Sequence, residues 1–138
     1  MKKDALNIAL HFLKFRPRSV FEIETKLKSK NISESEIKKV INVFKKNQLL
    51  DDTGFAKMWI RDRNLFKPSG SFLLKIELRR FGIAEDIIEN VLANQDNEEL
   101  AKQALESKGR LIKAEFIKKA AFLQRRGFST NIIYKILK

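Results

Sequence analysis

The stretch LRRFGIAEDIIENVL, residues 78–92, recurs in related form at two other places in the chain. The other copies are LKSKNISESEIKKVI at 27–41 and LQRRGFSTNIIYKIL at 123–137, with apolar residues at the same offsets. Successive copies start 51 and 45 residues apart, so one repeating unit takes about a third of the chain. A repeat of this length is typical of small helical units that stack into an extended surface, which argues against a single catalytic cleft.

Each copy predicts a helix, a tight turn and a second helix. The first helix runs up to a leucine, and four residues later comes a residue type that tolerates a left-handed backbone at a helix C-terminus: Asn31, Gly82 or Gly127. The second helix then starts at Ser33, Ala84 or Ser129. We expect Ser33 to form a capping box with Glu36, and Ser129 to cap its helix. Ala84 offers no capping side chain.

A further helix precedes each pair. Its apolar positions align in the three units: Ile8, Ala9, Phe12 and Leu13, then Phe55, Ala56, Trp59 and Ile60, then Leu100, Ala101, Ala104 and Leu105. Spacings of three and four residues are helical, and no stretch alternates apolar and polar residues as a strand would. We therefore predict an all-α chain of nine helices in three tandem three-helix repeats, which form an elongated, curved body: residues 1–48, 49–95 and 96–138.

Composition limits the classes of function. With 43% hydrophobic residues among 138, the chain can bury a core, but a single unit must lean on its neighbours. The chain has no Cys and a single His, His11, which excludes a thiolate metal site, and it has no phosphate-cradling Gly-rich loop. We expect no metal, no cofactor and no enzymatic activity. No apolar run approaches the roughly 20 residues of a membrane span, and the N-terminus has no apolar signal segment, which predicts a cytoplasmic protein.

The charge balance points to a polyanionic partner. The 29 basic and 17 acidic residues give a formal net charge of +12, a bias typical of proteins that bind polyanions. Residues 1–50 carry +7, residues 51–95 carry 0 and residues 96–138 carry +5. The middle unit is therefore the least basic.

Many basic residues gather near the end of each unit's second helix and in the loops before it. If the units stack, these side chains would form a discontinuous basic track along the body. The alternative is that cations at a helix C-terminus only complement its dipole and solvate the surface. Recurrence in all three units favours binding, and the predicted basic track consists of Arg16, Arg18, Lys26, Lys28, Lys30, Lys67, Lys75, Arg79, Arg80, Lys118, Lys119, Arg125 and Arg126.

Other conspicuous residues have plainer explanations than catalysis. Asp51 and Asp52 suggest paired carboxylates for a metal-dependent nuclease, but they stand just before a helix, where acids cap free amides. Trp59 offers a ring for base stacking, yet it aligns with positions on an apolar face, which favours core packing. Phe66 and Phe72 flank the loop at 67–71 and either contact a partner or plug the junction between units.

These residues resemble those of the RecX regulatory proteins, which modulate the RecA recombinase. The first unit is similar to the family's R-x-R-S-x-x-E-L-x-x-K-L, with Ile23 in place of the leucine after the glutamate: Arg16, Arg18, Ser19, Glu22, Lys26 and Leu27. The second unit shares a longer set: Leu50, Asp51, Asp52, Phe55, Ala56, Trp59, Arg63, Lys67, Pro68, Gly70, Glu77, Leu78, Gly82 and Ile83. The third unit ends in the family's R-R-G-F-S at 125–129, so the resemblance spans nearly the whole chain.

The resemblance implies a regulator without catalytic residues that binds the recombinase filament assembled on single-stranded DNA, lying along the filament's helical groove. Family members curb strand exchange and ATP hydrolysis by the filament, and they have some affinity for DNA. This would place the chain in homologous recombination, DNA repair and the SOS response. We expect it to act as a monomer.

A basic DNA-binding protein that acts without the recombinase is the alternative. A helix, a Gly-containing turn and a second helix also describe a helix-turn-helix. The second unit argues against three such readers, because Glu85, Asp86 and Glu89 on its recognition helix would repel phosphates. The third unit would be acceptable, with Thr130, Asn131, Tyr134 and Lys135 at the corresponding positions.

Overall fold

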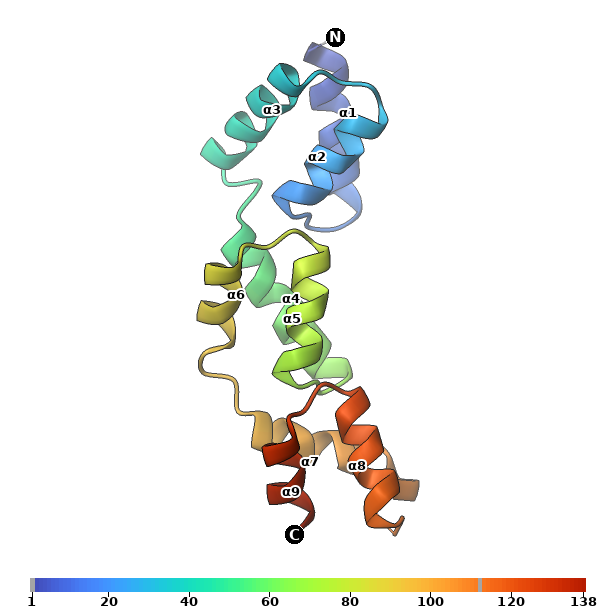
Figure 1. Ribbon diagram of the computed structural model, residues 1–138. Coiled ribbons are helices and arrows are strands. Elements are labelled where there is room, and N and C mark those ends of the chain that lie inside the picture. Colours follow the sequence, from blue (N-terminus) through green and yellow to red (C-terminus); the bar gives the residue numbers. More distant parts are fainter. Residues whose placement is uncertain (1, 112) are drawn as a thin grey trace.

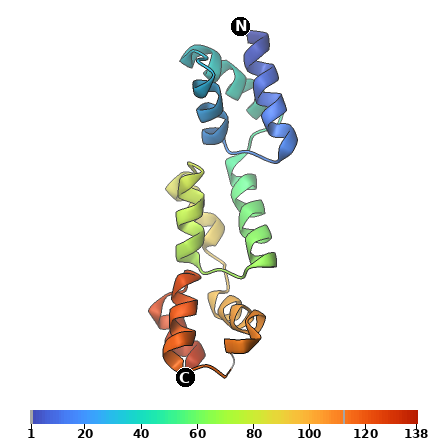
Figure 2. The ribbon, with the colours of Figure 1, turned by 90° about the vertical axis from the view of Figure 1, so that its right-hand side faces the viewer.

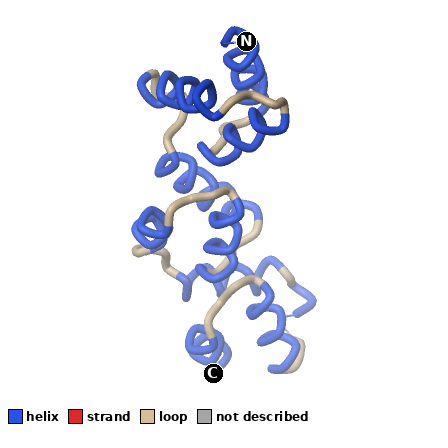
Figure 3. The backbone as a smooth tube through the Cα atoms, turned by 45° about the horizontal axis from the view of Figure 1, so that its top comes forward, coloured by secondary structure: helices blue, strands red, loops and turns tan. Residues whose placement is uncertain are grey.

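The computed structural model describes residues 2–111 and 113–138. Within these ranges it contains nine α-helices and one short 3₁₀ helix. None of the described residues forms a strand, and Figure 3 shows only helices and loops. The first six helices are α1 (Lys2–Phe15), α2 (Val20–Ser29), α3 (Glu34–Lys46), α4 (Asp52–Phe66), α5 (Ser71–Arg80) and α6 (Glu85–Leu92). The remaining elements are α7 (Asn97–Ser107), η1 (Gly109–Leu111), α8 (Phe116–Arg125) and α9 (Thr130–Leu137). The prediction of an all-α fold is confirmed.

The helices form three units that follow one another along an elongated, gently curved body (Figure 1, Figure 2). The two chain ends lie at opposite ends of this body. Helices α1–α3, α4–α6 and α7–α9 each enclose their own cluster of buried apolar side chains. The predicted unit boundaries stay predictions, and Leu50, which they assign to the second unit, is buried in the first cluster.

Helical periodicity explains which side chains fill the clusters. The face of α3 that the sequence predicts to be apolar is the one buried: Ile37, Val40, Ile41 and Phe44. Small residues let the first helix of each unit approach its neighbours closely, and all of them are fully buried: Ala5 and Ala9 in α1, Ala56 in α4, Ala101 and Ala104 in α7. Each unit thus buries one apolar stripe from each helix.

The turn in each unit has the left-handed backbone that its sequence predicts. The φ angle is +61° at Asn31, +73° at Gly82 and +90° at Gly127. In each unit the next N–H bonds back, at 3.1 Å, to the carbonyl of the leucine near the helix end: Ile32 to Leu27, Ile83 to Leu78 and Phe128 to Leu123. This is the Schellman pattern, which satisfies carbonyl groups that the helix leaves free.

The serine caps agree with the prediction only in part. Ser129 and Ser33 each accept a hydrogen bond from a backbone N–H in the first turn of their helices. The predicted capping box with Glu36 is incomplete among the described contacts, because only the serine half is formed. The complete box lies instead at the start of α2, between Ser19 and Glu22.

The two acids at the start of α4, Asp51 and Asp52, differ from the prediction. Asp51 stands at the N-cap position of α4 but makes no side-chain cap hydrogen bond, and the same is true of Ala84 at α6. Asp52 accepts a hydrogen bond from the Val20 N–H at 2.9 Å, at the start of α2. The prediction that both acids cap their own helix is therefore wrong, because Asp52 faces the free amides of a helix in the first unit.

The units meet at two joints that are built in the same way. At the first joint the start of α2 lies against the α5–α6 turn, and the Ser19 hydroxyl donates to the Phe81 carbonyl at 2.7 Å. At the second joint the start of α5 lies against the α8–α9 turn, and the Gly70 N–H donates to the Arg126 carbonyl at 2.7 Å. The start of one unit's second helix therefore holds the turn of the following unit.

This construction explains the two turn glycines. A Cβ atom at Gly82 would overlap the Phe21 side chain, and one at Gly127 would overlap the backbone and Cβ of Leu73. Asn31, at the same place in the first unit, is exposed. Glycine is needed at the second and third turns both for the left-handed φ and for the close approach of the preceding unit.

Candidate functional site

Arg16 and Arg18, the first two residues of the predicted basic track, both contact Glu22. Arg16 makes a bidentate ion pair with the Glu22 carboxylate, and an Arg18 nitrogen lies 3.5 Å from the same group. The carboxylate also accepts the Ser19 backbone N–H at 3.1 Å, so it holds the start of α2. The side chains of Arg18 and Glu22 are only 12% and 13% exposed. One carboxylate within the chain therefore holds both guanidinium groups and compensates part of their charge.

The same two arginines also pack on aromatic rings. The guanidinium carbon of Arg18 lies 3.6 Å from the centre of the Phe12 ring, and its Nε donates to the Phe12 carbonyl at 3.1 Å. The guanidinium of Arg16 lies 5.5 Å from the centre of the Phe81 ring, across the first joint. Such contacts fix α1 against α2 and the first unit against the second, which gives both arginines an architectural role.

The basic residues toward the end of α2 are more accessible. Lys28 and Lys30 are exposed, and none of the ion pairs between described residues involves them. Lys26 is partly buried and packs over an aromatic ring. Lys26 and Arg80 line a hollow of about 410 Å³ at the first joint, which also includes the Glu22 side chain. The positive charge of this hollow is therefore partly compensated.

Of the basic residues predicted on α5, only Arg80 is exposed and without an ion pair among the described residues. The Arg79 guanidinium donates to both carboxylate oxygens of Glu85, at the start of α6. This hydrogen bond raises the pKa of Arg79 and lowers the pKa of Glu85. Both groups are exposed, so the pair adds little to stability, but it reduces the charge that Arg79 offers to a partner. Lys75 is partly buried.

A pocket at the second joint collects three predicted residues of the track and two cations that sequence reasoning missed. We call it the second-joint basic pocket, and its volume is about 340 Å³. Its lining comes from three places: Lys67 in the α4–α5 loop, Lys108, Arg110 and Leu111 between α7 and α8, and Phe122, Arg125 and Arg126 at the C-terminal end of α8. Lys108 and Arg110 lie outside the repeated phrase, so only the stacking of the units reveals them.

Arg126 also holds the joint together. Its Nη1 donates to the Pro68 carbonyl at 3.0 Å, and its guanidinium lies 4.8 Å from the centre of the Phe122 ring. Burial lowers the pKa of Arg126, and the nearby Arg63 cation lowers it further. The side chain is thus a structural contact as well as part of the pocket wall.

Lys118 and Lys119 lie apart from the second-joint basic pocket. They precede Arg125 on α8 by about two helical turns, and neither lines the pocket. Lys118 is exposed and Lys119 is partly buried. The predicted track is therefore brought together at the second joint but not along the whole of α8.

The conspicuous aromatic residues are either packed or largely exposed. Trp59 lies 4.6 Å from Phe81 between ring centres, and its indole N–H donates to Glu77 at 2.9 Å, which confirms core packing. Phe66 and Phe72 are 81% and 60% exposed. Neither plugs a junction between units, so contact with a partner stays the prediction for both.

Acidic residues do not assemble a metal site in the part of the chain that the structure describes. Within residues 2–111 and 113–138 no group of three His, Asp or Glu side chains is placed to hold an ion. Glu85, Asp86 and Glu89 are exposed on α6. Among the described helices, none has the length and apolarity needed to cross a membrane.

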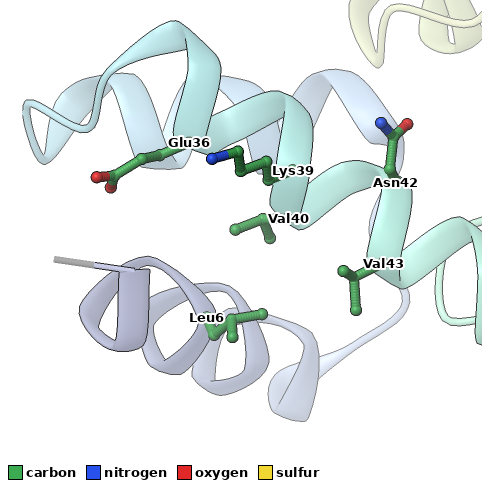
Figure 4. Close-up of a pocket in the computed structure, with 6 residues that line it drawn as sticks. All are labelled: Leu6, Glu36, Lys39, Val40, Asn42 and Val43. Carbon is green, nitrogen blue, oxygen red and sulfur yellow. The ribbon is translucent and has the colours of Figure 1, made fainter.

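An apolar hollow of about 370 Å³ lies between α1 and α3 (Figure 4). Leu6 of α1 and Val40 and Val43 of α3 point into it, while polar side chains lie along α3: Glu36, Lys39 and Asn42. Apolar walls suit hydrophobic contact and provide no group for catalysis.

Comparison with known proteins identifies the family. A family model described as RecX, first three-helix domain, matches residues 5–42, and the model of the second three-helix domain matches 51–92. The regulatory protein RecX of Prosthecochloris aestuarii is 37% identical over 131 residues, covering 95% of this chain and 83% of that protein. The protein of the same name from Vibrio parahaemolyticus is 36% identical over 131 residues, covering 91% of this chain and 84% of that protein. The crystal structure of RecX from Lactobacillus salivarius has a TM-score of 0.87 at 26% identity, covering 99% of this chain and 94% of that one. The chain belongs to the RecX family of regulatory proteins.

Proposed function

We propose that this protein binds a RecA-type recombinase filament assembled on single-stranded DNA and lowers the filament's ATP hydrolysis and strand exchange. It acts as a cytoplasmic monomer without catalytic activity of its own, in homologous recombination, DNA repair and the SOS response. The observation that carries the proposal is the family membership, which extends over 95% of the chain. The elongated shape and the exposed basic residues give it further support.

The shape of the protein suits a filament. Its units follow one another in an elongated body (Figure 1), whereas a compact substrate would call for one deep cleft. The exposed cations of the predicted track that form no ion pair among the described residues are spread over all three units: Lys28 and Lys30, then Lys67 and Arg80, then Lys118 and Arg125. Attachment at several weak points along a long partner gives high overall affinity without one strong site.

Direct reading of DNA bases by the helix pairs has less support. Helix α6 exposes three acids, and one of them, Glu85, already holds Arg79. On α9, Lys135 lies 3.1 Å from Glu98 in an ion pair. Helix-turn-helix proteins use phosphate contacts to position the recognition helix, and these acids work against such contacts.

Retention on recombinase filaments tests the proposal. Single-stranded DNA is immobilised and loaded with recombinase and a non-hydrolysable nucleotide analogue, with bare DNA and recombinase alone as controls. We expect retention on the assembled filament to be much stronger than on either component. Equal retention on bare DNA would contradict the proposal and favour the DNA-binding alternative.

A further inference from the structure

We infer that the second-joint basic pocket binds a run of phosphate groups and that this ligand ties the second unit to the third. The cations that would hold it are Lys67, Lys108, Arg110, Arg125 and Arg126. The inference rests on the proposed function for its setting, since a filament on DNA supplies phosphates. Its physical support is independent of the recombinase.

The pocket gathers positive charge without internal compensation. None of the ion pairs between described residues involves its five cations, and no acidic residue lines it. The hollow at the first joint differs, because Glu22 lies there beside Lys26 and Arg80. Cations held together on a concave surface reinforce one another's potential, so this pocket attracts anions strongly.

The surroundings of Arg126 also favour an anion beside it. The pKa of Arg126 is lowered first by burial and then by the charge of Arg63. Both effects disfavour the charged guanidinium, and a bound anion would offset both. An anion in the pocket would therefore favour the charged form of Arg126.

The composition of the pocket selects phosphate. Three of its five cations are arginines, whose planar guanidinium groups grip phosphate oxygens with two parallel hydrogen bonds. Its volume of about 340 Å³ is at the lower end of the roughly 300–1,000 Å³ typical of ligand sites. Five positive charges exceed what one phosphate group neutralises, so the ligand is a run of phosphates, either a polynucleotide backbone or a free polyphosphate.

The position of the pocket gives its ligand a mechanical effect. Lys67 belongs to the second unit, whereas the other four cations belong to the third. The direct polar contacts across this joint include the Gly70 N–H on the Arg126 carbonyl, the Phe72 N–H on the Gly127 carbonyl, the Arg126 side chain on Pro68 and hydrogen bonds between Ser71 and Asn97. A ligand that bridges Lys67 and Arg125 would resist bending at the joint and stabilise the folded chain by mass action.

An exposed aromatic residue favours a polynucleotide as the source of the phosphates. Phe66 directly precedes Lys67 in the chain and is 81% exposed. Bases of single strands stack on such rings while nearby cations hold the backbone. A free polyphosphate would gain nothing from Phe66, which makes this residue useful for separating the two sources.

Calorimetric titration with inorganic tripolyphosphate tests the pocket. The pocket variant removes three exposed cations and leaves Arg126 to hold the joint: Lys67→Gln, Arg110→Gln and Arg125→Gln. A control variant of equal net charge removes three exposed cations of the first unit that lie outside the predicted track: Lys38→Gln, Lys39→Gln and Lys46→Gln. Circular dichroism checks that both variants keep the helicity of the parent.

We expect the pocket variant to bind tripolyphosphate about tenfold more weakly or worse, and the control variant to stay within about twofold of the parent. Tripolyphosphate should also raise the melting temperature of the parent and of the control, but not that of the pocket variant. Equal weakening in the two variants, or none in the pocket variant, would overturn the inference.

A short oligothymidylate separates the two sources of phosphate. If the pocket variant also loses the oligonucleotide, and Phe66→Ala weakens oligonucleotide but not tripolyphosphate binding, the ligand is a polynucleotide backbone. If the oligonucleotide binds independently of the pocket, the ligand is a free polyphosphate, and the site still stands. Inhibition of recombinase ATP hydrolysis by the parent is measured separately. If the parent binds tripolyphosphate but does not inhibit the recombinase, only the proposed function is contradicted. If the parent inhibits the recombinase but does not bind tripolyphosphate, only the inference about the pocket is contradicted.

Discussion

A single carboxylate, Glu22, accounts for most of the motif R-x-R-S-x-x-E in the first unit. It forms ion pairs with Arg16 and Arg18, and it accepts a hydrogen bond from the backbone N–H of Ser19, whose hydroxyl caps α2. Every charged residue of the motif therefore has a partner inside the chain. The sequence predicts these arginines on a binding surface. A pattern of charges along the chain does not reveal which carboxylate the fold places beside each arginine.

Removing the charge of Glu22 should destabilise the protein. Glu22→Gln leaves Arg16 and the largely buried Arg18 without a counter-charge, so we expect the free energy of unfolding to fall by about 1–3 kcal/mol. Glu24→Gln on the same helix is the matched control, since no ion pair among the described residues involves Glu24, and its effect should stay within about 0.5 kcal/mol. Denaturant unfolding measures both variants. Equal stability of the two would show that the Glu22 contacts are not stabilising.

Asp52 should make stability depend on pH in a defined direction. Burial raises the pKa of its carboxyl above the ordinary value of 3.8, although the Val20 N–H and Lys45 oppose this. The folded chain therefore holds the proton more tightly than the unfolded chain, and the stabilising contribution is complete below 3.8 and lost as the pH rises through the folded pKa.

Asp52→Asn keeps an oxygen for the Val20 N–H but carries no charge. We expect the variant to be at least as stable as the parent at neutral pH. The difference in their free energies of unfolding should shrink as the pH is lowered toward the ordinary pKa of the acid, because Asp52 of the parent then becomes protonated. Denaturant titrations over a pH series measure the difference. A variant that is less stable at neutral pH and gains on the parent in acid would contradict this assignment.

At the scale of elements, short-range rules account for the turn inside each unit. A Gly or Asn after a helix end, followed by an apolar residue, is a local signal, and the left-handed φ angles confirm what it predicts. A local signal does not say which unit presses on the turn. The approach of Phe21 to Gly82, and the hydrogen bond from Val20 to Asp52, therefore could not be predicted from the sequence.

The turn glycines should tolerate substitution much less well than Asn31. Gly127→Val combines an unfavourable φ of +90° with overlap onto Leu73 of the second unit, so we expect a loss of at least about 1–3 kcal/mol. Asn31→Gly changes an exposed turn residue, so its free energy of unfolding should differ from that of the parent by only about a few tenths of a kcal/mol, as is usual for such a site. Thermal unfolding followed by circular dichroism compares the two. If Gly127→Val melted like the parent, the joint would be wrongly described.

At the scale of the whole molecule, the repeated phrase predicts three helical units in an extended order, and the structure has them. It predicts the candidate site only in part. Arg79 turns out to be held by Glu85, while Lys108 and Arg110 enter a pocket with Lys67. The pocket depends on how one unit is rotated on the next, and periodicity within a unit carries no information about that rotation. The Arg79–Glu85 pair lies within one unit and depends on how α6 follows the turn after α5.

Inhibition of recombinase ATP hydrolysis by a charge-reversed protein tests the central claim most directly. The track variant reverses four exposed cations that form no ion pair among the described residues: Lys28→Glu, Lys30→Glu, Arg80→Glu and Arg125→Glu. The control reverses four exposed cations outside the predicted track and has the same net charge: Lys38→Glu, Lys46→Glu, Lys57→Glu and Lys102→Glu. Helicity is checked for both.

We predict that parent and control inhibit the filament's ATP hydrolysis, with an effect that weakens as salt rises because neutralised phosphates release counterions. The track variant should need at least about tenfold more protein for the same inhibition, since its opposed charges repel the filament. A folded track variant that inhibits as well as the parent would contradict the account.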